Sequence, residues 1–386
     1  VLGSGPRALH SWRLLAAALA RCTTTTIPIG GHQVAATLHP MPFERIGDGS
    51  SAYAWSLTDK GVRVGFDLVL FRTERYTGEL IYSSLGPPPL TAVRTFAQAA
   101  VAKAGTGSTA RIPSSVSIAT APARTARTAL GPVAYREIGA GPPLLLITGY
   151  LASLEGWDPR FVDALAQRHR VVVFDNAGIG PTRALSPLTI DAMANQSSAL
   201  ISALGLGRTD VLGWSMGSMI AQALAVLHPS QVGRLVLCAA YPGNGTTVRP
   251  PQAAIDALNS GSEQRALAVM FPADQIGARD GYLAALTAQP AAPALSAATE
   301  AAQAAAIKRW WSGQDPAGRR PQAISAPTLI ADGAQDQLDP ISNSRLLARL
   351  IPRARLLLYP DAGHAFLFQD HAQVAAAIEA FLGAAG

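Results

Sequence analysis

The sequence predicts two folded parts of different class. Residues 131–386 are expected to form an α/β domain with a mostly parallel sheet, and residues 1–105 a small α+β domain with an antiparallel sheet. From Gly131 onward, apolar strand-like runs alternate with helical patterns, which is typical of a parallel sheet covered on both faces. Between Gly31 and Tyr82, short runs of alternating polarity are separated by turn residues instead. In the larger part, Gly213-Trp214-Ser215-Met216-Gly217 joins an apolar run to a helical pattern, which predicts a sharp strand-to-helix turn.

The smaller part is expected to begin with a helix within residues 1–30, followed by a threonine-rich turn at residues 23–26. A second helix is predicted over residues 90–104, where apolar residues recur with a period near 3.6. Four strands are predicted between these helices, at residues 34–38, 52–57, 62–72 and 79–83. Antiparallel strands flanked by two helices give the α+β class.

Residues 106–130 are rich in Gly, Ser, Thr, Ala and Pro, and this composition predicts a flexible linker. The basic excess of the chain lies at this end, because residues 1–127 carry 13 Lys and Arg against 6 Asp and Glu. A basic segment favours anionic surfaces such as cell-envelope polymers. Nucleic acid is not an expected partner, since the sequence contains no Lys/Arg cluster with interleaved aromatic residues.

In the larger part, predicted strands alternate with predicted helices. Strands are predicted at residues 133–138, 144–148, 170–175, 210–212, 235–238, 328–331 and 355–359, and helices at residues 161–168, 190–204, 218–227, 342–350 and 374–382. Residues 242–321 interrupt this order with alanine-rich helices and many prolines, and are predicted to be a lid. No run of eighteen apolar residues is present, so no transmembrane segment is expected.

Ser215 is the predicted nucleophile. The glycines on either side of it suit a strained turn that leaves no room for a Cβ atom. The helix that follows points its N-terminus at the serine, where backbone N–H groups can meet developing negative charge. The alternative is a glycine-rich loop whose serine caps a helix.

A serine nucleophile needs a base, and in this kind of domain the base follows the serine and the acid in the chain. His364 is the predicted base, because it follows the last strand in a glycine-containing loop at the edge where open α/β sheets keep their sites. His228 is expected to cap the helix that leaves Ser215. His371 opens the last helix, away from that edge.

The predicted acid is Asp336, which lies in the loop after the strand at residues 328–331. Asp332 is still at the strand end, and Asp339 precedes a proline and is expected to be a helix N-cap. The predicted oxyanion hole consists of the N–H of Met216, directly after the nucleophile, and the N–H of Tyr150.

Four apolar residues are predicted to line the substrate pocket, with core packing as the alternative for each: Leu151, Trp214, Trp310 and Trp311. A neutral, hydrophobic substrate suits such a wall, since no charged pair stands out to bind a charged one. Neither Cys22 nor Cys238 lies in a Cys/His spacing typical of zinc sites, so no metal or other cofactor is expected.

These residues together resemble the α/β-hydrolase superfamily over residues 131–386, and within it the esterase, lactonase and non-haem haloperoxidase-like branch. Two further motifs carry the resemblance, Val173-Phe174-Asp175-Asn176-Ala177-Gly178-Ile179-Gly180 and Asp361-Ala362-Gly363-His364. The resemblance implies an α/β-hydrolase fold with a helical lid. The chain departs from the family where the usual His-Gly before the oxyanion residue is replaced by Thr148-Gly149.

Residues 5–105 resemble the extracellular sensor domain of mycobacterial Ser/Thr kinases and lipoproteins. The resemblance is carried by Phe43, by the run from Gly47 to Tyr53, by the strand ending at Arg72 and by the helix at residues 90–103. It implies a secreted or cell-envelope location, with cytoplasmic as the alternative, and a cell-envelope ligand for this domain. Such domains usually carry paired disulfides, so Cys22 would need a partner outside this chain.

The predicted function is a serine hydrolase that cleaves a neutral hydrophobic carboxylic ester, thioester or lactone through a Ser-His-Asp triad and an acyl-enzyme. One alternative is a cofactor-free perhydrolase or haloperoxidase with the same triad, which peroxide dependence would distinguish. The other is a ligand-binding sensor protein on a hydrolase scaffold. An intact set of Ser215, Asp336 and His364 favours catalysis, since a scaffold has no physical need for all three.

Overall fold

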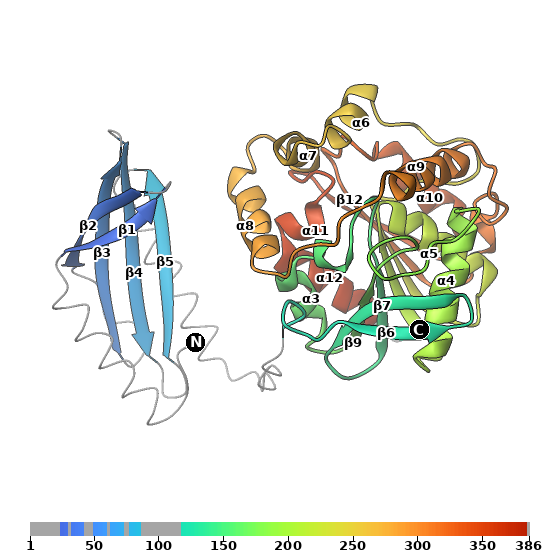
Figure 1. The fold of residues 1–386 in the computed structure, drawn as a ribbon, viewed down its shortest axis with the longest axis horizontal. Helices are drawn as coiled ribbons and strands as arrows, with labels where there is room; N and C mark the ends of the chain where they lie inside the picture. The colour runs from blue at the N-terminus through green and yellow to red at the C-terminus, as the bar shows by residue number, and fades with distance from the viewer. Residues whose placement is uncertain are drawn as a thin grey trace. The chain divides into compact units, whose positions relative to one another are not determined.

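The computed structural model describes residues 24–29, 32–41, 49–59, 62–72, 77–85 and 117–383. The chain divides into two compact units, Val1–Ala110 and Arg111–Gly386, and each contains its own sheet (Figure 1). The N-terminal unit carries an antiparallel sheet and the C-terminal unit a mostly parallel one, as predicted.

The five strands of the N-terminal sheet lie side by side in chain order. They are β1 (Thr24–Ile29), β2 (His32–Met41), β3 (Gly49–Asp59), β4 (Val62–Arg72) and β5 (Thr77–Leu85). The four predicted strands are confirmed, but the predicted threonine-rich turn at 23–26 is wrong from Thr24 onward. Threonine is β-branched and suits an extended strand, which explains β1. Cys22, most of the first predicted helix and the whole of the second lie outside the described residues.

The C-terminal unit contains an eight-stranded sheet in the order β13-β12-β11-β10-β8-β9-β7-β6. The strands are β6 (Arg124–Thr128), β7 (Gly131–Ile138), β8 (Pro143–Ile147), β9 (Arg170–Phe174), β10 (Thr209–Trp214), β11 (Val232–Cys238), β12 (Thr328–Gly333) and β13 (Ala354–Tyr359). From β13 to β9 all neighbours are parallel, whereas β7 pairs antiparallel with both β9 and β6. All seven predicted strands are present, and Cys238 ends β11 as a buried, unpaired residue.

Helices cover this sheet on both faces. The helices α4 (Ile190–Ala203), α5 (Met216–Leu227) and α10 (Ser342–Leu350) pack on one face, and α3 (Pro159–Leu165) and α12 (His371–Leu382) on the other. Strand β8 shows why two layers are needed: Leu145 and Ile147 enter one core, and Leu144 and Leu146 the other. Alternate side chains of a strand point to opposite faces, so a wholly apolar strand requires cover on both.

Four helices are inserted between β11 and β12, in the segment predicted to be a lid. They are α6 (Gln252–Leu258), α7 (Glu263–Met270), α8 (Ile276–Thr287) and α9 (Ala297–Trp311). In Figure 1, α6, α7 and α9 lie at the upper side of the unit and α8 at its left flank. Hydrogen bonds attach this lid insertion to the sheet unit: the Tyr282 hydroxyl donates to the Gly156 carbonyl at 3.0 Å, and the Ala365 N–H donates to the Met270 carbonyl at 3.0 Å. The insertion is therefore anchored at both α7 and α8.

The predicted linker over residues 106–130 is wrong in its described part. Ile118 is 1% exposed, and its N–H donates to the Asp163 carboxylate at 2.9 Å. Strand β6 pairs with β7 and buries Ala126 in the core. An edge strand needs apolar residues on one face only, so its composition can resemble that of a linker.

This boundary gives a truncation test. Deleting residues 1–110 should leave the C-terminal unit folded, whereas deleting residues 1–127 removes Ile118 and most of β6. Burial of one large apolar side chain contributes about 1.5–3 kcal/mol, so the longer deletion should lower the free energy of unfolding by at least that amount. Urea denaturation of the two truncated proteins compares them, and equal stabilities would contradict the assignment of β6 to the core.

Candidate active site

Ser215 lies at the turn between β10 and α5, with φ +57° and ψ −122°. A positive φ is strained for a non-glycine residue and recurs at functional sites. A Cβ on Gly213 would collide with the Gly217 carbonyl, and a Cβ on Gly217 with the Ile147 carbonyl, so neither glycine is replaceable. The Ser215 side chain makes no capping hydrogen bond to α5, so the alternative role of a helix cap is wrong.

His364 and Asp336 are joined by a hydrogen bond of 2.7 Å between Nδ1 and Oδ2. The His364 side chain is 5% exposed and that of Asp336 is fully buried. Their two loops pack directly together, because a Cβ on Gly333 would collide with the Ala362 and Gly363 carbonyls. The structure therefore brings the predicted base and acid into contact at the carboxyl ends of β12 and β13.

The second carboxylate oxygen of Asp336 accepts the N–H groups of Leu338 and Asp339, each at 2.7 Å. These bonds hold the carboxylate in place while Oδ2 faces the imidazole. Backbone groups of the same loop thus fix the orientation of the Asp336 side chain.

The other two aspartates of this region, Asp332 on β12 and Asp339 in the loop that follows, are fully buried and bond elsewhere. Asp332 accepts from the Ser344 hydroxyl at 2.7 Å, and Asp339 accepts from the Asn343 amide at 2.9 Å. Burial raises the pKa of both carboxyls well above the ordinary value, and the neighbouring carboxylates raise it further. The expected N-cap role of Asp339 is wrong, because α10 is preceded by Ile341 at its cap.

Trp214 connects the histidine loop to the serine turn. Its Nε1 donates to the His364 carbonyl at 3.1 Å, and the two rings lie 5.5 Å apart between centroids. The indole is 5% exposed and packs edge-on against Phe368 at 4.9 Å. Trp214 therefore packs in the core beside His364, and its role as a pocket residue stays a prediction.

The remaining histidines of this region lie where the sequence predicts. His228 caps the end of α5, and its Nε2 lies 2.8 Å from the Asn195 amide oxygen. His371 is the first residue of α12.

The segments that carry the two predicted oxyanion donors adjoin Ser215. A Cβ on Gly149 would lie 3.3 Å from the Ser215 Cβ, which places the chain just before Tyr150 against the serine. Met216 is the first residue of α5, and the N–H groups of a first helical turn have no acceptor within the helix.

Leu151 lines a pocket of about 480 Å³ together with Leu283, Leu286 and Pro290 of the lid insertion. Because Ser215, Asp336 and His364 do not line this pocket, the place of Leu151 in a substrate pocket stays a prediction. Trp311 is half-buried, and its ring lies 5.5 Å from that of Tyr241; its role in a pocket stays a prediction.

The predicted pocket role of Trp310 is wrong. Its side chain is fully buried, and Nε1 donates to the Tyr241 carbonyl at 3.1 Å. Gly243 and Gly318 form the slot for the ring, since a Cβ on either would meet the indole at 3.0 Å or less. Trp310 therefore attaches α9 to the core.

Trp310→Ala should lower the free energy of unfolding by about 3–5 kcal/mol, as for other buried tryptophans. Because the side chain does not face a substrate, the variant should lose activity on short and long esters in the same proportion. Thermal melts beside rates on a p-nitrophenyl ester series measure both effects. If Trp310→Ala changes the preference for ester chain length but not the melting temperature, Trp310 lines the substrate pocket after all.

Asp175, directly after β9, is a further buried carboxyl, and its Oδ1 accepts the Leu154 N–H at 2.7 Å. Burial raises its pKa to about 7, against the opposing effect of that hydrogen bond. Between about pH 4 and 7 the folded state then keeps a proton that the unfolded state has lost, so the stability falls as the pH rises. Asp175→Asn should flatten this part of the pH profile of urea unfolding. An unchanged slope would contradict the assignment.

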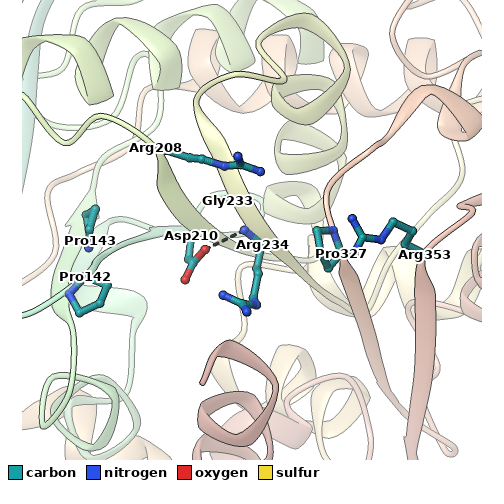
Figure 2. A pocket seen from close by; sticks show the side chains of 8 residues that line it. All are labelled: Pro142, Pro143, Arg208, Asp210, Gly233, Arg234, Pro327 and Arg353. Atoms are coloured by element: carbon teal, nitrogen blue, oxygen red, sulfur yellow. Dashed lines mark hydrogen bonds between the residues drawn. The ribbon is translucent and has the colours of Figure 1, made fainter. Parts of the chain in front are cut away.

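Figure 2 shows a second pocket, of about 460 Å³, at the opposite edge of the sheet. Its lining contains three arginines but no serine, cysteine or histidine: Pro142, Pro143, Arg208, Asp210, Gly233, Arg234, Pro327 and Arg353. These residues lie at or near the amino ends of parallel strands. Ser215, Asp336 and His364 lie at the carboxyl ends, where open α/β sheets bind their ligands.

Comparison with known proteins identifies the family. Residues 142–371 match the family model described as the alpha/beta hydrolase fold. The chain belongs to the α/β-hydrolase fold family. Among solved structures, this α/β hydrolase is similar to an alpha/beta hydrolase fold protein from Chitinophaga pinensis, with a TM-score of 0.62 and 26% sequence identity over 70% of this chain and 100% of that one.

Three curated relatives show the range of names within this family. The hydrolase is 31% identical to 2-hydroxymuconate semialdehyde hydrolase of Pseudomonas, over 64% of this chain and 88% of the relative. It is 29% identical to a Mycobacterium tuberculosis protein named as a non-heme bromoperoxidase, BpoC, over 61% and 92%. It is 32% identical to polyketide synthase ThaQ of Burkholderia thailandensis, over 63% of this chain but only 12% of that protein.

The family model leaves the N-terminal unit unmatched, and the resemblance of that unit to a sensor domain stays a prediction. Within the described residues, no helix is long and apolar enough to cross a membrane. The same residues contain no group of three His, Cys, Asp or Glu side chains arranged to hold a metal ion.

Two residues near the serine were missed by sequence reasoning. Asn176 donates to the Thr148 carbonyl at 3.1 Å, and Gln303 accepts the Leu151 N–H at 2.9 Å. Asn176 lies within a motif that the sequence analysis singled out, but nothing in the motif indicates its partner. Gln303 lies in an alanine-rich helix with no signal of its own.

Proposed function

We propose that this α/β hydrolase is a serine hydrolase that cleaves a neutral hydrophobic carboxylic ester, thioester or lactone. The 2.7 Å hydrogen bond between His364 and Asp336, beside the strained turn at Ser215, is the observation that carries the proposal. A buried acid and base in contact, beside a half-buried serine in a strained turn, are the parts that acyl transfer needs.

In the proposed reaction, the Ser215 Oγ attacks the substrate carbonyl carbon while His364 Nε2 takes its proton. Asp336 keeps the proton of the imidazole on Nδ1, so that Nε2 is the acceptor. The resulting oxyanion is stabilised by the N–H groups of Tyr150 and Met216. Collapse breaks the bond to the leaving alcohol or thiol, which takes its proton from His364.

Water completes the cycle. His364 removes a proton from a water molecule that attacks the acyl carbon, and the proton returns to Ser215 Oγ as the acid product leaves. Apolar side chains beside the site, such as Trp214, whose ring lies 5.5 Å from that of His364, support an uncharged acyl or alcohol group.

The relative named as a bromoperoxidase supports a second candidate, a cofactor-free perhydrolase. There hydrogen peroxide replaces water in the second step, and the products are a peracid and free Ser215.

The resemblance of the N-terminal unit supports an extracytoplasmic location and a cell-envelope ligand as part of the proposal. A sensor protein on an inactive scaffold is the third candidate.

Rates on p-nitrophenyl acetate and octanoate, an acyl thioester and a γ-lactone, with and without hydrogen peroxide, test these candidates. The proposal predicts turnover without peroxide that is absent in Ser215→Ala. Product formed only in the presence of peroxide would favour the perhydrolase. No turnover under either condition would favour the sensor.

A further inference from the structure

We propose that Gln303 and Asn176 are positioning residues that hold the oxyanion loop, residues 148–151, from its two ends. The inference rests on the proposed function, because it concerns the N–H of Tyr150 within that loop. If it holds, the rate of catalysis depends on a residue of α9, a helix of the lid insertion.

Gln303 lies on α9 and is fully buried. Its Oε1 accepts the Leu151 N–H at 2.9 Å across 152 residues of sequence. A backbone N–H can only donate, so the amide oxygen must face Leu151, and the orientation of the amide is fixed. Its Nε2 is buried without an acceptor among the described residues. The side chain is thus buried with both N–H donors of its amide unmet, and its single hydrogen bond within the described part of the chain goes to the oxyanion loop.

The backbone at Leu151 is strained. The Ala152 N–H donates to the Gly149 carbonyl at 3.4 Å and closes a four-residue turn. Leu151, the third residue, has φ +57°, whereas Tyr150 does not have a positive φ. A positive φ at the third residue of a turn is usually taken by glycine or asparagine, as in type II turns. The Leu151 N–H takes no part in the turn, and Gln303 is the group that accepts it.

Asn176 holds the other end of the loop. It follows β9, is 1% exposed, and donates from Nδ2 to the Thr148 carbonyl at 3.1 Å. The Thr148 side chain is itself fully buried, and its hydroxyl has no partner within the described residues. The threonine that stands in place of the expected histidine therefore does not organise the loop through its side chain. The side-chain amides of Asn176 and Gln303 hold the loop instead.

The Tyr150 N–H lies between these two attachment points. Donors of an oxyanion hole act through their placement, and a displacement of about 1 Å can lower a rate by about 100-fold. The helix α9 has other attachments, since the Thr299 hydroxyl donates to the Gly178 carbonyl at 3.0 Å and Trp310 fills its slot. Replacing Gln303 should therefore release the oxyanion loop while α9 keeps its position.

Three variants test the inference. Gln303→Met keeps the size of the side chain and removes the acceptor, and Gln303→Glu keeps an acceptor oxygen. Gln196→Met is the matched control: Gln196 is 1% exposed, makes one hydrogen bond to the Arg183 carbonyl at 3.3 Å, and has an unpartnered amide oxygen among the described residues. Each is assayed on p-nitrophenyl acetate, with thermal melts and with hydrogen exchange of the peptide that covers residues 149–154.

For Gln303→Met we expect kcat to fall by about 10- to 100-fold with KM little changed, since the hole acts on the transition state. The exchange of residues 149–154 should become faster. Gln303→Glu should recover most of the lost kcat. Gln196→Met should lower the melting temperature without changing kcat or this exchange.

If the wild type is active and Gln303→Met has the same kcat, the inference is overturned and the proposed function stands. Equal losses in Gln303→Met and Gln303→Glu that follow the melting temperature would reduce Gln303 to a packing residue, which also overturns it. A wild type with no turnover would overturn the proposed function instead. If Gln303→Met does not fold, Asn176→Leu applies the same test at the other end of the loop, with the same fall in kcat expected and unchanged kcat as the contrary result.

Discussion

Ser215→Ala is expected to lower kcat/KM for a short ester by about 10⁵- to 10⁶-fold, because the triad acts as a unit and the attacking atom is removed. The fold should persist. The backbone bond from the Ser215 N–H to the Cys238 carbonyl, at 2.9 Å, does not involve the hydroxyl. The side chain also makes no capping bond that alanine would lose.

The measurement compares initial rates on p-nitrophenyl acetate, with circular dichroism to show that the variant is folded. The strained φ at Ser215 is equally demanding for alanine, so the melting temperature should change little. More than about a tenth of the wild-type rate in this variant would contradict a serine mechanism, since triad knockouts retain far less.

Asp336→Asn is expected to lower kcat by about 10⁴-fold, as for the orienting aspartate of other triads. An asparagine oxygen can still accept the N–H groups of Leu338 and Asp339, so the loop should keep its shape. The amide then presents a donor to His364 Nδ1, which favours the tautomer with the proton on Nε2. In that tautomer the imidazole cannot accept the Ser215 proton.

Asp339→Asn is the matched control, because Asp339 is buried in the same loop and bonds to Asn343 rather than to His364. Its effect on kcat should be at least 100-fold smaller than that of Asp336→Asn, in keeping with a residue outside the triad. A larger loss in Asp339→Asn would move the acid assignment to that residue.

Much of the fold could be predicted because parallel strands covered on both faces are continuous apolar runs, as at residues 144–147. The two strands that were missed lie at sheet edges. Strand β6 has one buried residue, Ala126, among polar neighbours, and β1 begins with three threonines. With a single buried residue, β6 has too few apolar positions for periodicity to detect, and the threonines of β1 are not apolar.

The contact between Asp336 and His364 could be predicted because the carboxyl ends of neighbouring parallel strands meet at one edge of the sheet. The contacts across the lid insertion could not. Gln303 lies 152 residues from Leu151, and the slot for Trp310 is made by Gly243 and Gly318. Such pairings depend on how the inserted helices pack, and helix periodicity alone does not indicate which residue faces the core.

Covalent labelling with a fluorophosphonate probe shows whether Ser215 is an activated nucleophile, because the probe reacts with a serine only when base and oxyanion hole are in place. We expect one adduct, located by peptide mass spectrometry on Ser215, absent in Ser215→Ala and strongly slowed in His364→Ala. An adduct on a different residue, or an active wild type that the probe does not label, would contradict this role of Ser215.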